Sequence, residues 1–416
     1  MAHAHRHGGG PAAPQAHRRL LAVVAGALAA ATVVGIVALW PSGDVRAGTG
    51  ITFGSRLYSA TVTDATTFGC TDSPTGAVGT CARYRFALTQ GPDRGERRSI
   101  RFSDAPSTPR LAIGDRVILA RVPGAEPGFD YAYSDRQRRS VLWWLAALFA
   151  IVVVAVGRLR GMAALVGLAA SMTLILGFMV PSMLDGNNAP AVAIVSATAI
   201  AFVVLYVTNG FRTLTTVALL ATLVALALTV VLATVFTELA HITGVTSEDA
   251  LLLQLGTTNV DLKGLVLAGM VVGALGVLDD ITVTQVAAID ELRRSSPGAD
   301  SRTLYRSGMR VGRDHVASTV NTLALAYAGA ALPLLILFTL ADQSLGTVAN
   351  SEAVAVEIVA TLVGSIGLVA AVPVSTGLAT WMSPPGPDPS AGVVVSPANL
   401  DSANLDSADP IRRLPE

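Results

Sequence analysis

Long runs of apolar residues alternate with short polar stretches over most of the chain. These runs cover residues 20–40, 141–157, 162–181, 189–207, 213–236, 264–283, 316–340 and 353–380. A helix needs about 17 to 25 mostly apolar residues to cross a hydrocarbon layer of about 30 Å. The pattern therefore predicts an all-α polytopic membrane bundle of about eight transmembrane helices.

Residues 41–138 interrupt this pattern and have the composition of a soluble domain. The strand-like segments within them lie at 57–63, 84–88, 97–102 and 116–121. Tyr84, Phe86 and Leu88 alternate with polar neighbours, which is the period of a half-buried strand, and a Gly/Pro/Asp turn at 91–95 follows them. We expect a small extracytoplasmic β domain of about five strands, which could close as a barrel, between the first and second spans.

These patterns divide the chain into five segments. They are a disordered cytoplasmic N-tail at 1–19, a transmembrane anchor at 20–40, the extracytoplasmic β domain at 41–138, a seven-span membrane domain at 139–382 and a disordered cytoplasmic C-tail at 383–416. The first apolar run could instead be a signal peptide, but its length favours an uncleaved span. The tails are expected to be disordered because they are rich in small and polar residues.

Arginine residues concentrate in alternate connections between the apolar runs, whereas the other connections are acidic. The arginine-rich connections are 158–161, 208–212 and 290–313. Because basic loops tend to stay in the cytoplasm, this charge pattern predicts that both termini are cytoplasmic. Arg136, Arg138 and Arg139 fall on the external side, but they end a long domain, where the rule is weaker.

Composition agrees with a membrane protein and excludes several other classes. Hydrophobic residues make up 52% of the chain, charged residues make up 14%, and the net charge is zero. Lys263 is the only lysine and no concentrated basic face is evident, so we expect the lipid bilayer but no nucleic acid as a partner. Neither a nucleotide-binding loop nor a His-Glu-x-x-His motif occurs in the sequence, so no cofactor is predicted.

Cys70 and Cys81 are the only cysteines, and both fall in the predicted β domain. Outside the cytoplasm such a pair most simply forms a disulfide, because the compartment is oxidising and a small domain gains stability from a cross-link. A redox-active pair is the alternative. We favour the structural disulfide because the two residues do not have the Cys-x-x-Cys spacing.

Asp279 and Asp280 stand next to each other inside the apolar run at 264–283. An ionised carboxylate near the middle of a bilayer costs about 2.5 to 3.5 kcal/mol, so this pair needs a partner, a cation, a proton or water. At about 100° per residue, the glycines that share a helix face with Asp280 are Gly269, Gly273 and Gly276. The pattern fits an ion or proton site, and it equally fits a packing seam that another helix approaches closely.

The next apolar run begins with polar residues on one side of a helix, and these reach a similar depth. Asn321 would lie about 10 Å below the inner membrane edge, close to the level of the two aspartates. Carboxylate, amide and hydroxyl oxygens suit a hard cation or a relayed proton. The predicted ion or proton site consists of Asp279, Asp280, Asn321, Thr319 and His315. In the alternative, Asn321 only hydrogen-bonds Asp280 to fix two helices, and His315 is an interface residue.

The most distinctive segments of the chain surround these polar positions. They are GALGVLDDITVTQ at 273–285, VGRDHVASTVNTLALAYAGA at 311–330 and LVGSIGLV at 362–369. In these segments the chain resembles the YibE/F family of bacterial integral membrane proteins. The resemblance extends over roughly residues 51–380 and implies an extracytoplasmic domain followed by a multi-span region in a bacterial plasma membrane. It carries no catalytic residue over to this chain.

Two kinds of function fit these features. The first is a secondary transporter or ion-coupled permease in which Asp279 and Asp280 form the coupling site. The second is a non-catalytic sensor, assembly protein or partner subunit whose β domain binds an envelope component or a second copy of the chain. An intramembrane aspartyl protease would need two aspartates that face each other, whereas these adjacent residues point about 100° apart. We therefore expect no enzymatic activity.

Overall fold

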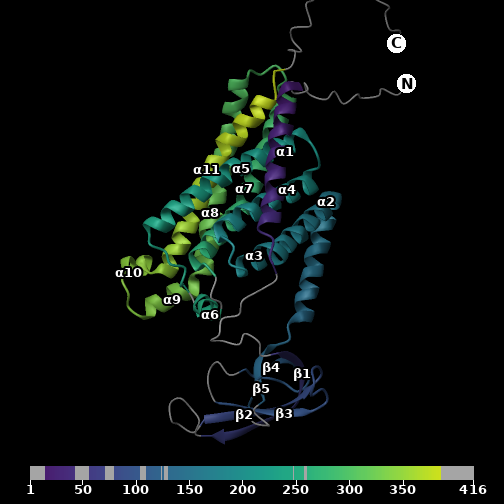
Figure 1. Ribbon diagram of the computed structural model, residues 1–416, viewed down its shortest axis with the longest axis vertical. Coiled ribbons are helices and arrows are strands. Elements are labelled where there is room, and N and C mark those ends of the chain that lie inside the picture. The colour runs from purple at the N-terminus through teal and green to yellow at the C-terminus, as the bar shows by residue number, and fades with distance from the viewer. Residues whose placement is uncertain are drawn as a thin grey trace, which may run out of the picture. The chain divides into compact units, whose positions relative to one another are not determined.

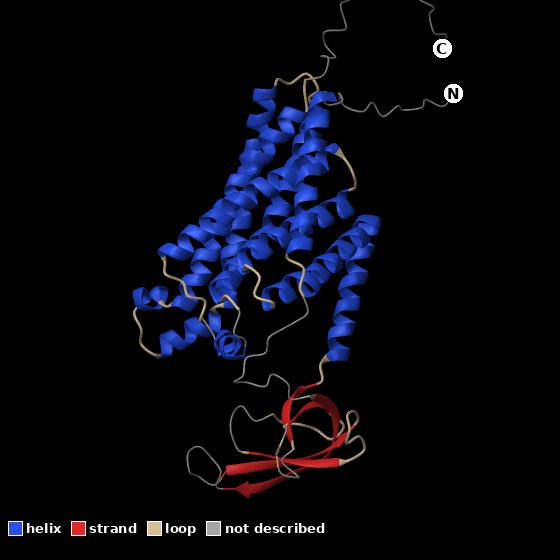
Figure 2. Ribbon diagram, in the orientation of Figure 1, coloured by secondary structure: helices blue, strands red, loops and turns tan. Residues whose placement is uncertain are grey.

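The protein is a computed structural model that describes residues 15–42, 56–70, 79–103, 109–122, 124–125, 130–246, 248–256 and 260–385. Its chain divides into two compact units. The helical unit takes its residues from 1–43, 169–247 and 261–416, and the second unit takes its residues from 44–168 and 248–260. Helices predominate, and the described strands all belong to one small sheet (Figure 1; Figure 2).

The sheet contains five antiparallel strands, as the alternating pattern predicts. They are β1 (Leu57–Cys70), β2 (Gly79–Leu88), β3 (Arg97–Phe102), β4 (Arg116–Arg121) and β5 (Tyr131–Arg136). Their order is β3-β2-β1-β4-β5. Irregularities in pairing between Val62 and Asp64 and between Ile118 and Leu119 mark bulges, which bend and twist a sheet.

The two edge strands of this sheet meet through their side chains. Arg98 in β3 donates from Nε to both carboxylate oxygens of Asp130, at 3.1 Å each. The rings of Phe102 and Tyr133 lie edge to face with centroids 5.5 Å apart. The sheet therefore curls around its own core, where side chains such as Phe86 are fully buried.

The predicted disulfide is present in this domain. Cys70 at the end of β1 is bonded to Cys81 in β2, with the two Cα atoms 5.7 Å apart. The strands pair directly here, because Phe68 lies opposite Cys81 and Cys70 lies opposite Gly79. The bond therefore fixes the end of the β1–β2 pair, in agreement with the sequence interpretation.

The helical unit is built mainly from long apolar helices. Its helices are α1 (Gln15–Ala38), the π-helical turn η1 (Ile175–Met179), α3 (Val180–Leu184), α4 (Ala189–Asn209), α5 (Thr213–Leu239), α7 (Leu262–Ser295), α8 (Ser301–Ala330), α9 (Leu332–Leu340), α10 (Leu345–Asn350) and α11 (Glu352–Met382). The second unit holds α6 (Glu248–Gly256) and most of α2 (Arg139–Leu174). Six helical segments of the described chain are long and apolar enough to cross a membrane, or seven if α8 and α9, bent by 57°, form one span.

α2 is one element where the hydrophobic pattern predicts two spans. Arg158, inside it, has φ 51° and ψ −129°, which breaks the helical path. A Cβ atom on Gly161 would overlap the carbonyl of Val153, although residues eight positions apart in a straight helix are separated by about 12 Å. The chain therefore folds back at Arg158 into two arms. The predicted total of eight spans counts each arm separately and stays a prediction.

The centre of the helical unit is the packing of α5, α7 and α11 (Figure 1). Thr222 of α5 and Thr282 of α7 share a buried hydrogen bond of 2.6 Å between their hydroxyl oxygens. A Cβ atom on Gly367 of α11 would overlap the hydroxyl of Thr229 in α5, so these helices approach closely. Small and hydroxyl residues allow such contacts between membrane helices.

Basic residues gather at one end of the helical unit. The ring of His17 at the start of α1 stacks on Trp381 near the end of α11, with centroids 4.0 Å apart. Arg293 near the end of α7 donates from Nη2 to the carbonyl of Ser383 at 2.7 Å. The start of α1 and the ends of α7 and α11 therefore lie together, beside the arginine-rich α7–α8 connection.

Candidate functional site

Asp279 and Asp280 lie on α7 in different surroundings. Asp279 is half-buried, and its Oδ1 atom is buried without a hydrogen-bond partner among the described residues. Asp280 is exposed. Because successive helix residues point about 100° apart, one carboxylate turns toward the packed bundle and the other away from it.

The buried residues near Asp279 on α7 include a threonine that hydrogen-bonds its backbone. Leu278 and Ile281 on α7 are almost fully buried. Thr282 donates to the carbonyl of Asp279 at 3.1 Å and shares its other hydrogen bond with Thr222. The hydrogen bond from Thr282 therefore fixes the backbone at Asp279. The buried carboxylate oxygen still needs a proton, a cation or water as its partner.

Asp280 belongs to an open stripe along α7. The other members of this stripe are Gly269, Gly273, Gly276 and Thr284, and all of them are exposed. A Cβ atom on Gly269 or Gly276 would meet nothing within 4 Å, and one on Gly273 would meet only the hydroxyl of Tyr327 at 3.2 Å. The predicted glycine face is thus open in the described chain, and its role in helix packing stays a prediction.

α8 contacts the bundle through glycines that the sequence analysis did not single out. A Cβ atom on Gly308 would overlap Ile289 of α7, and one on Gly312 would overlap Val372 of α11. Thr319 lies on the same side of α8 as Gly312, since seven residues turn a helix by about 700°. Nine residues turn it by about 900°, so Asn321 lies on the opposite side.

Among the described residues, hydrogen bonds do not join the five residues of the predicted site into one cluster. His315 and Thr319 are half-buried, and Thr319 donates to the carbonyl of His315 at 3.0 Å. Asn321 is exposed. No described hydrogen bond or ion pair joins any of these three to Asp279 or Asp280. A shared ion or proton site of all five residues stays a prediction.

Two buried polar residues near the site were missed as functional candidates. Gln285 is 2% exposed and donates from Nε2 to the carbonyl of Gly308 at 2.8 Å and to Oγ1 of Thr376 at 2.7 Å. Arg293 is 3% exposed and donates to backbone carbonyls of Ala299 and Ser383. Gln285 joins α7 to α8 and α11. Its polar amide, between the end of the apolar run at 264–283 and the apolar residues 286–289, was the available signal.

A further acid, Glu357, lies near the start of α11. Glu357 of α11 is half-buried and lines a cavity of about 350 Å³ together with Tyr327 of α8. The hydroxyl of Tyr327 also approaches Gly273 on the open stripe of α7. The sequence analysis did not select Glu357, although it stands in an apolar run as Asp279 does.

The described residues contain no group of three or more His, Cys, Asp or Glu side chains that could hold a metal ion. A cation at Asp279 would therefore take its remaining ligands from hydroxyl groups, backbone carbonyls or water. Such oxygen ligands suit hard cations. A proton would need only the carboxylate and a water path.

Comparison with known proteins relates the membrane part of the chain to a family. The sequence model of the family described as YibE/F-like protein matches residues 145–384, which include the two aspartates, most of α2 and the helices that follow it up to α11. The β sheet lies outside the matched residues. No curated protein and no solved structure matches the chain.

Proposed function

The chain belongs to the YibE/F-like protein family, and from this premise we propose that it is a secondary transporter or ion-coupled permease. Asp279 and Asp280 would form the site that takes up the coupling proton or cation. The observation that carries the proposal is the buried, unpartnered Oδ1 of Asp279 in a helix apolar and long enough to cross a membrane. Its charge would cost about 2.5 to 3.5 kcal/mol near the bilayer centre, so a proton or cation is expected there.

The proposed topology has eight spans, with each arm of α2 crossing once and the bent pair of α8 and α9 crossing once. The termini are placed in the cytoplasm and the β domain outside a bacterial plasma membrane. The support is the gathering of Arg293, Arg294 and the arginines of α8 at one end of the helical unit. Basic segments favour the cytoplasmic side.

A series of polar groups along the helical unit supports movement of a small ion. Counted from the start of α11, Glu357 lies about 7 Å along the helix axis. Gly273, which Tyr327 approaches, lies about 16 Å from the start of α7, and Asp279 lies about 25 Å from it. The same end of the unit holds both helix starts. Glu352 accepts hydrogen bonds from the backbone N–H groups of Thr243 and Gly244, and a Cβ atom on Gly244 would overlap the carbonyl of Leu262 at the start of α7. Counted from that end of the unit, Glu357, the Tyr327 hydroxyl beside Gly273, and Asp279 therefore lie at depths about 9 Å apart.

The test is flux through the purified full-length protein in lipid vesicles. Proton entry would be followed with a trapped pH dye, and Na⁺, K⁺ and Mg²⁺ uptake with ion-selective dyes. We expect Asp279→Asn to reduce the active flux at least tenfold and Asp280→Asn to reduce it less, because only Asp279 has a buried carboxylate oxygen. Glu291→Gln is the matched control, since Glu291 is an exposed acid on the same helix.

Equal flux in wild type and Asp279→Asn, with both proteins folded, would refute the transport proposal for this site. Folding of each variant would be checked by gel filtration and thermal unfolding. The proposal that the chain is not an enzyme is separate. Cleavage of a membrane substrate that depends on these aspartates would contradict it.

The alternative function is a non-catalytic membrane component whose β domain binds an envelope ligand. The observation that favours it is an exposed basic face on β2 and β3. Arg83 lies directly opposite Arg101, and both guanidinium groups stand about 5 Å from the ring centre of Phe68. Arg97 is also exposed on β3, whereas Arg85 on β2 pairs with Asp64 at 3.1 Å. Like charges placed opposite each other favour an anionic partner, such as a phosphate-bearing polymer.

This alternative predicts a different result from the transport proposal. The double variant Arg83→Gln/Arg101→Gln would lose binding to an anionic envelope polymer, whereas the transport proposal predicts that this variant keeps the ion flux of the wild type. Arg116→Gln/Arg121→Gln, on β4, is the control because it removes the same charge from another strand. Equal binding by both double variants would contradict a specific role for the β2–β3 face.

A further inference from the structure

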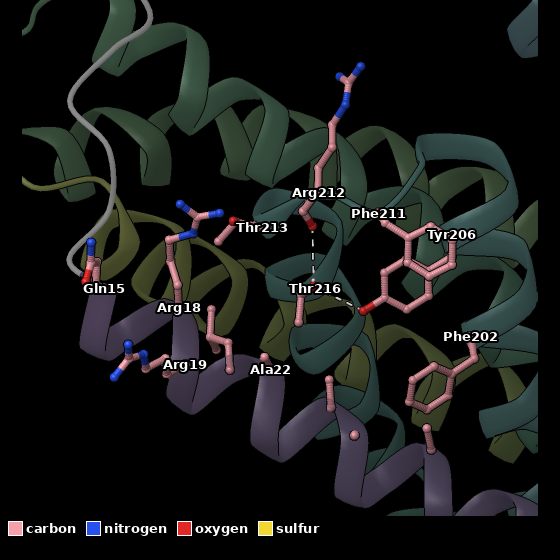
Figure 3. A pocket seen from close by; sticks show the side chains of 14 residues that line it. Gln15, Arg18, Arg19, Ala22, Phe202, Tyr206, Phe211, Arg212, Thr213 and Thr216 are labelled. Atoms are coloured by element: carbon pink, nitrogen blue, oxygen red, sulfur yellow. Dashed lines mark hydrogen bonds between the residues drawn. The ribbon is translucent and has the colours of Figure 1, made fainter.

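A cavity of about 800 Å³ lies between α1, the end of α4 and the start of α5, and neither Asp279 nor Asp280 lines it (Figure 3). All of the elements that line it belong to the helical unit. Its size falls within the range of sites that hold small molecules. The function proposed above does not use it.

One end of this cavity is strongly basic. Arg18, Arg19 and Arg212 line it, and no acidic side chain is among the described residues of its wall. Figure 3 shows Arg18 and Arg212 extending in the same direction on either side of Thr213. No described ion pair uses these guanidinium groups. Arginine binds phosphate through two parallel hydrogen bonds, so this end is suited to a phosphate group.

An aromatic wall stands beside the arginines. The rings of Tyr206 and Phe211 stack with centroids 4.8 Å apart, and Phe202 stacks on the other side of Tyr206 at 6.2 Å. The hydroxyl of Tyr206 shares a hydrogen bond of 3.1 Å with Thr216, which fixes the ring. Phe211 lies in the short connection between the apolar helices α4 and α5, and its side chain is 91% exposed. Tyrosine is enriched at the membrane–water interface, which fits Tyr206 near the end of the apolar helix α4.

The remaining wall is a smooth apolar strip on α1. Its members are Ala22, Ala25, Gly26 and Ala29. They follow the i, i+3, i+4, i+7 spacing, which places them on one helix face. A Cβ atom on Gly26 would meet nothing within 4 Å, so the strip is open. An apolar strip next to a basic end matches the two-part chemistry of a phospholipid.

We propose that this cavity binds one anionic phospholipid. Its phosphate lies against Arg18 and Arg212, its glycerol region lies beside the aromatic wall, and an acyl chain lies along the α1 strip. Basic pockets between membrane helices recognise anionic headgroups in this way. A soluble phosphate would use the arginines but would gain nothing from the apolar strip, which favours the lipid.

The experiment is native mass spectrometry of the full-length protein in a neutral detergent. Phosphatidylglycerol, phosphatidylcholine and inorganic phosphate would be titrated separately. We expect one phosphatidylglycerol to bind at least tenfold more tightly than phosphatidylcholine. The double variant Arg18→Gln/Arg212→Gln should abolish this preference. Arg302→Gln/Arg306→Gln is the matched control, because these exposed arginines on α8 lie outside the cavity.

A second variant separates the lipid from a soluble anion. Gly26→Leu fills the apolar strip without touching an arginine, and it should weaken phosphatidylglycerol binding while the open space keeps the fold intact. The proposal is overturned if the two lipids bind equally to wild type, if the Arg18/Arg212 variant keeps the preference, or if inorganic phosphate binds as tightly as the lipid. These results do not depend on ion flux.

Discussion

Two neighbouring aspartates on α7 differ in burial because successive helix residues point about 100° apart. Asp279 turns one oxygen into the packed interior, whereas Asp280 faces the open stripe. The sequence predicts that two acids lie in an apolar helix, because composition alone shows it. It does not predict which acid is buried, because the rotation of α7 is set by its contacts with α5 and α11. Asn321 illustrates the same limit, since packing through Gly308 and Gly312 turns it away.

Replacing Asp279 by leucine should stabilise the protein and abolish its proposed transport. The change removes a buried oxygen without a partner, which costs about 1 to 3 kcal/mol in the native state. We expect the free energy of unfolding in detergent to rise by about this amount. Asp290→Leu is the control, because Asp290 only pairs with Arg294 at the helix surface and its removal should change stability by less than about 1 kcal/mol. A fall in stability for Asp279→Leu would show that its carboxylate has a partner.

Tyr131 should make the β domain sensitive to alkaline pH. Burial, and then the hydrogen bond that its hydroxyl donates to Asp93 at 2.6 Å, raise the pKa of Tyr131 to about 12. The unfolded chain has a tyrosine pKa of about 10. The raised pKa means that the neutral phenol is favoured in the folded state, so its stabilisation is complete below pH 10 and is lost between about pH 10 and pH 12.

The measurement is phenolate absorbance against pH, taken as the difference between wild type and Tyr131→Phe in the full-length protein. Thermal unfolding at the same pH values would follow the loss of stability. A phenolate signal for Tyr131 that is complete by pH 10 would contradict the role of burial and of Asp93.

Glycine has two different uses in the helices of this protein. On α8 and α11, glycines lie where a side chain would overlap a neighbouring helix, and they allow close packing. On α7, Gly269 and Gly276 face open space. Periodicity in the sequence identifies the α7 stripe but not what covers it, because spacing along one helix contains no information about its neighbours. The β strands were easier to predict, since alternation of apolar and polar residues directly reports which face is buried.

Substitutions at two glycines should therefore have different effects. Gly308→Val would overlap Ile289, and overpacking of this kind costs about 1 to 3 kcal/mol or more. Gly276→Val should leave the thermal unfolding of the single chain almost unchanged. If a second copy packs on the α7 stripe, Gly276→Val should also reduce self-association, measured by light scattering after gel filtration. Equal losses of stability in the two variants would contradict the open position of Gly276.

At the scale of the whole molecule, the sequence predicts an apolar helical bundle and a separate β domain, and the structure confirms both. It predicts two spans at 141–157 and 162–181, where the structure has a single α2 that folds back at Arg158. The connection at 158–161 is short. Only Arg158 in α2 departs from helical backbone angles, so the helix continues directly after it. Gly161 makes this possible, because only a residue without a Cβ fits beside the carbonyl of Val153.

The eight-span topology can be tested by labelling introduced cysteines from each side of the membrane. If each arm of α2 crosses once, Arg158→Cys and Ala299→Cys should react with a membrane-impermeant maleimide only after the cytoplasmic side is opened. Asp342→Cys should react in intact cells. The disulfide between Cys70 and Cys81 leaves no free native thiol to interfere. Labelling of Arg158→Cys from outside would mean that α2 does not cross the membrane twice.

If the β domain lies outside the membrane, as proposed, the bond between Cys70 and Cys81 reports when that domain has been exported. Glutathione and thioredoxin keep thiols reduced in the cytosol, whereas the space beyond a bacterial plasma membrane permits oxidation. Chains still awaiting translocation should therefore carry two alkylatable thiols, and chains that have completed it should carry none. Acid quenching of growing cells followed by a gel-shift reagent would count the two populations and time the passage of the outer domain.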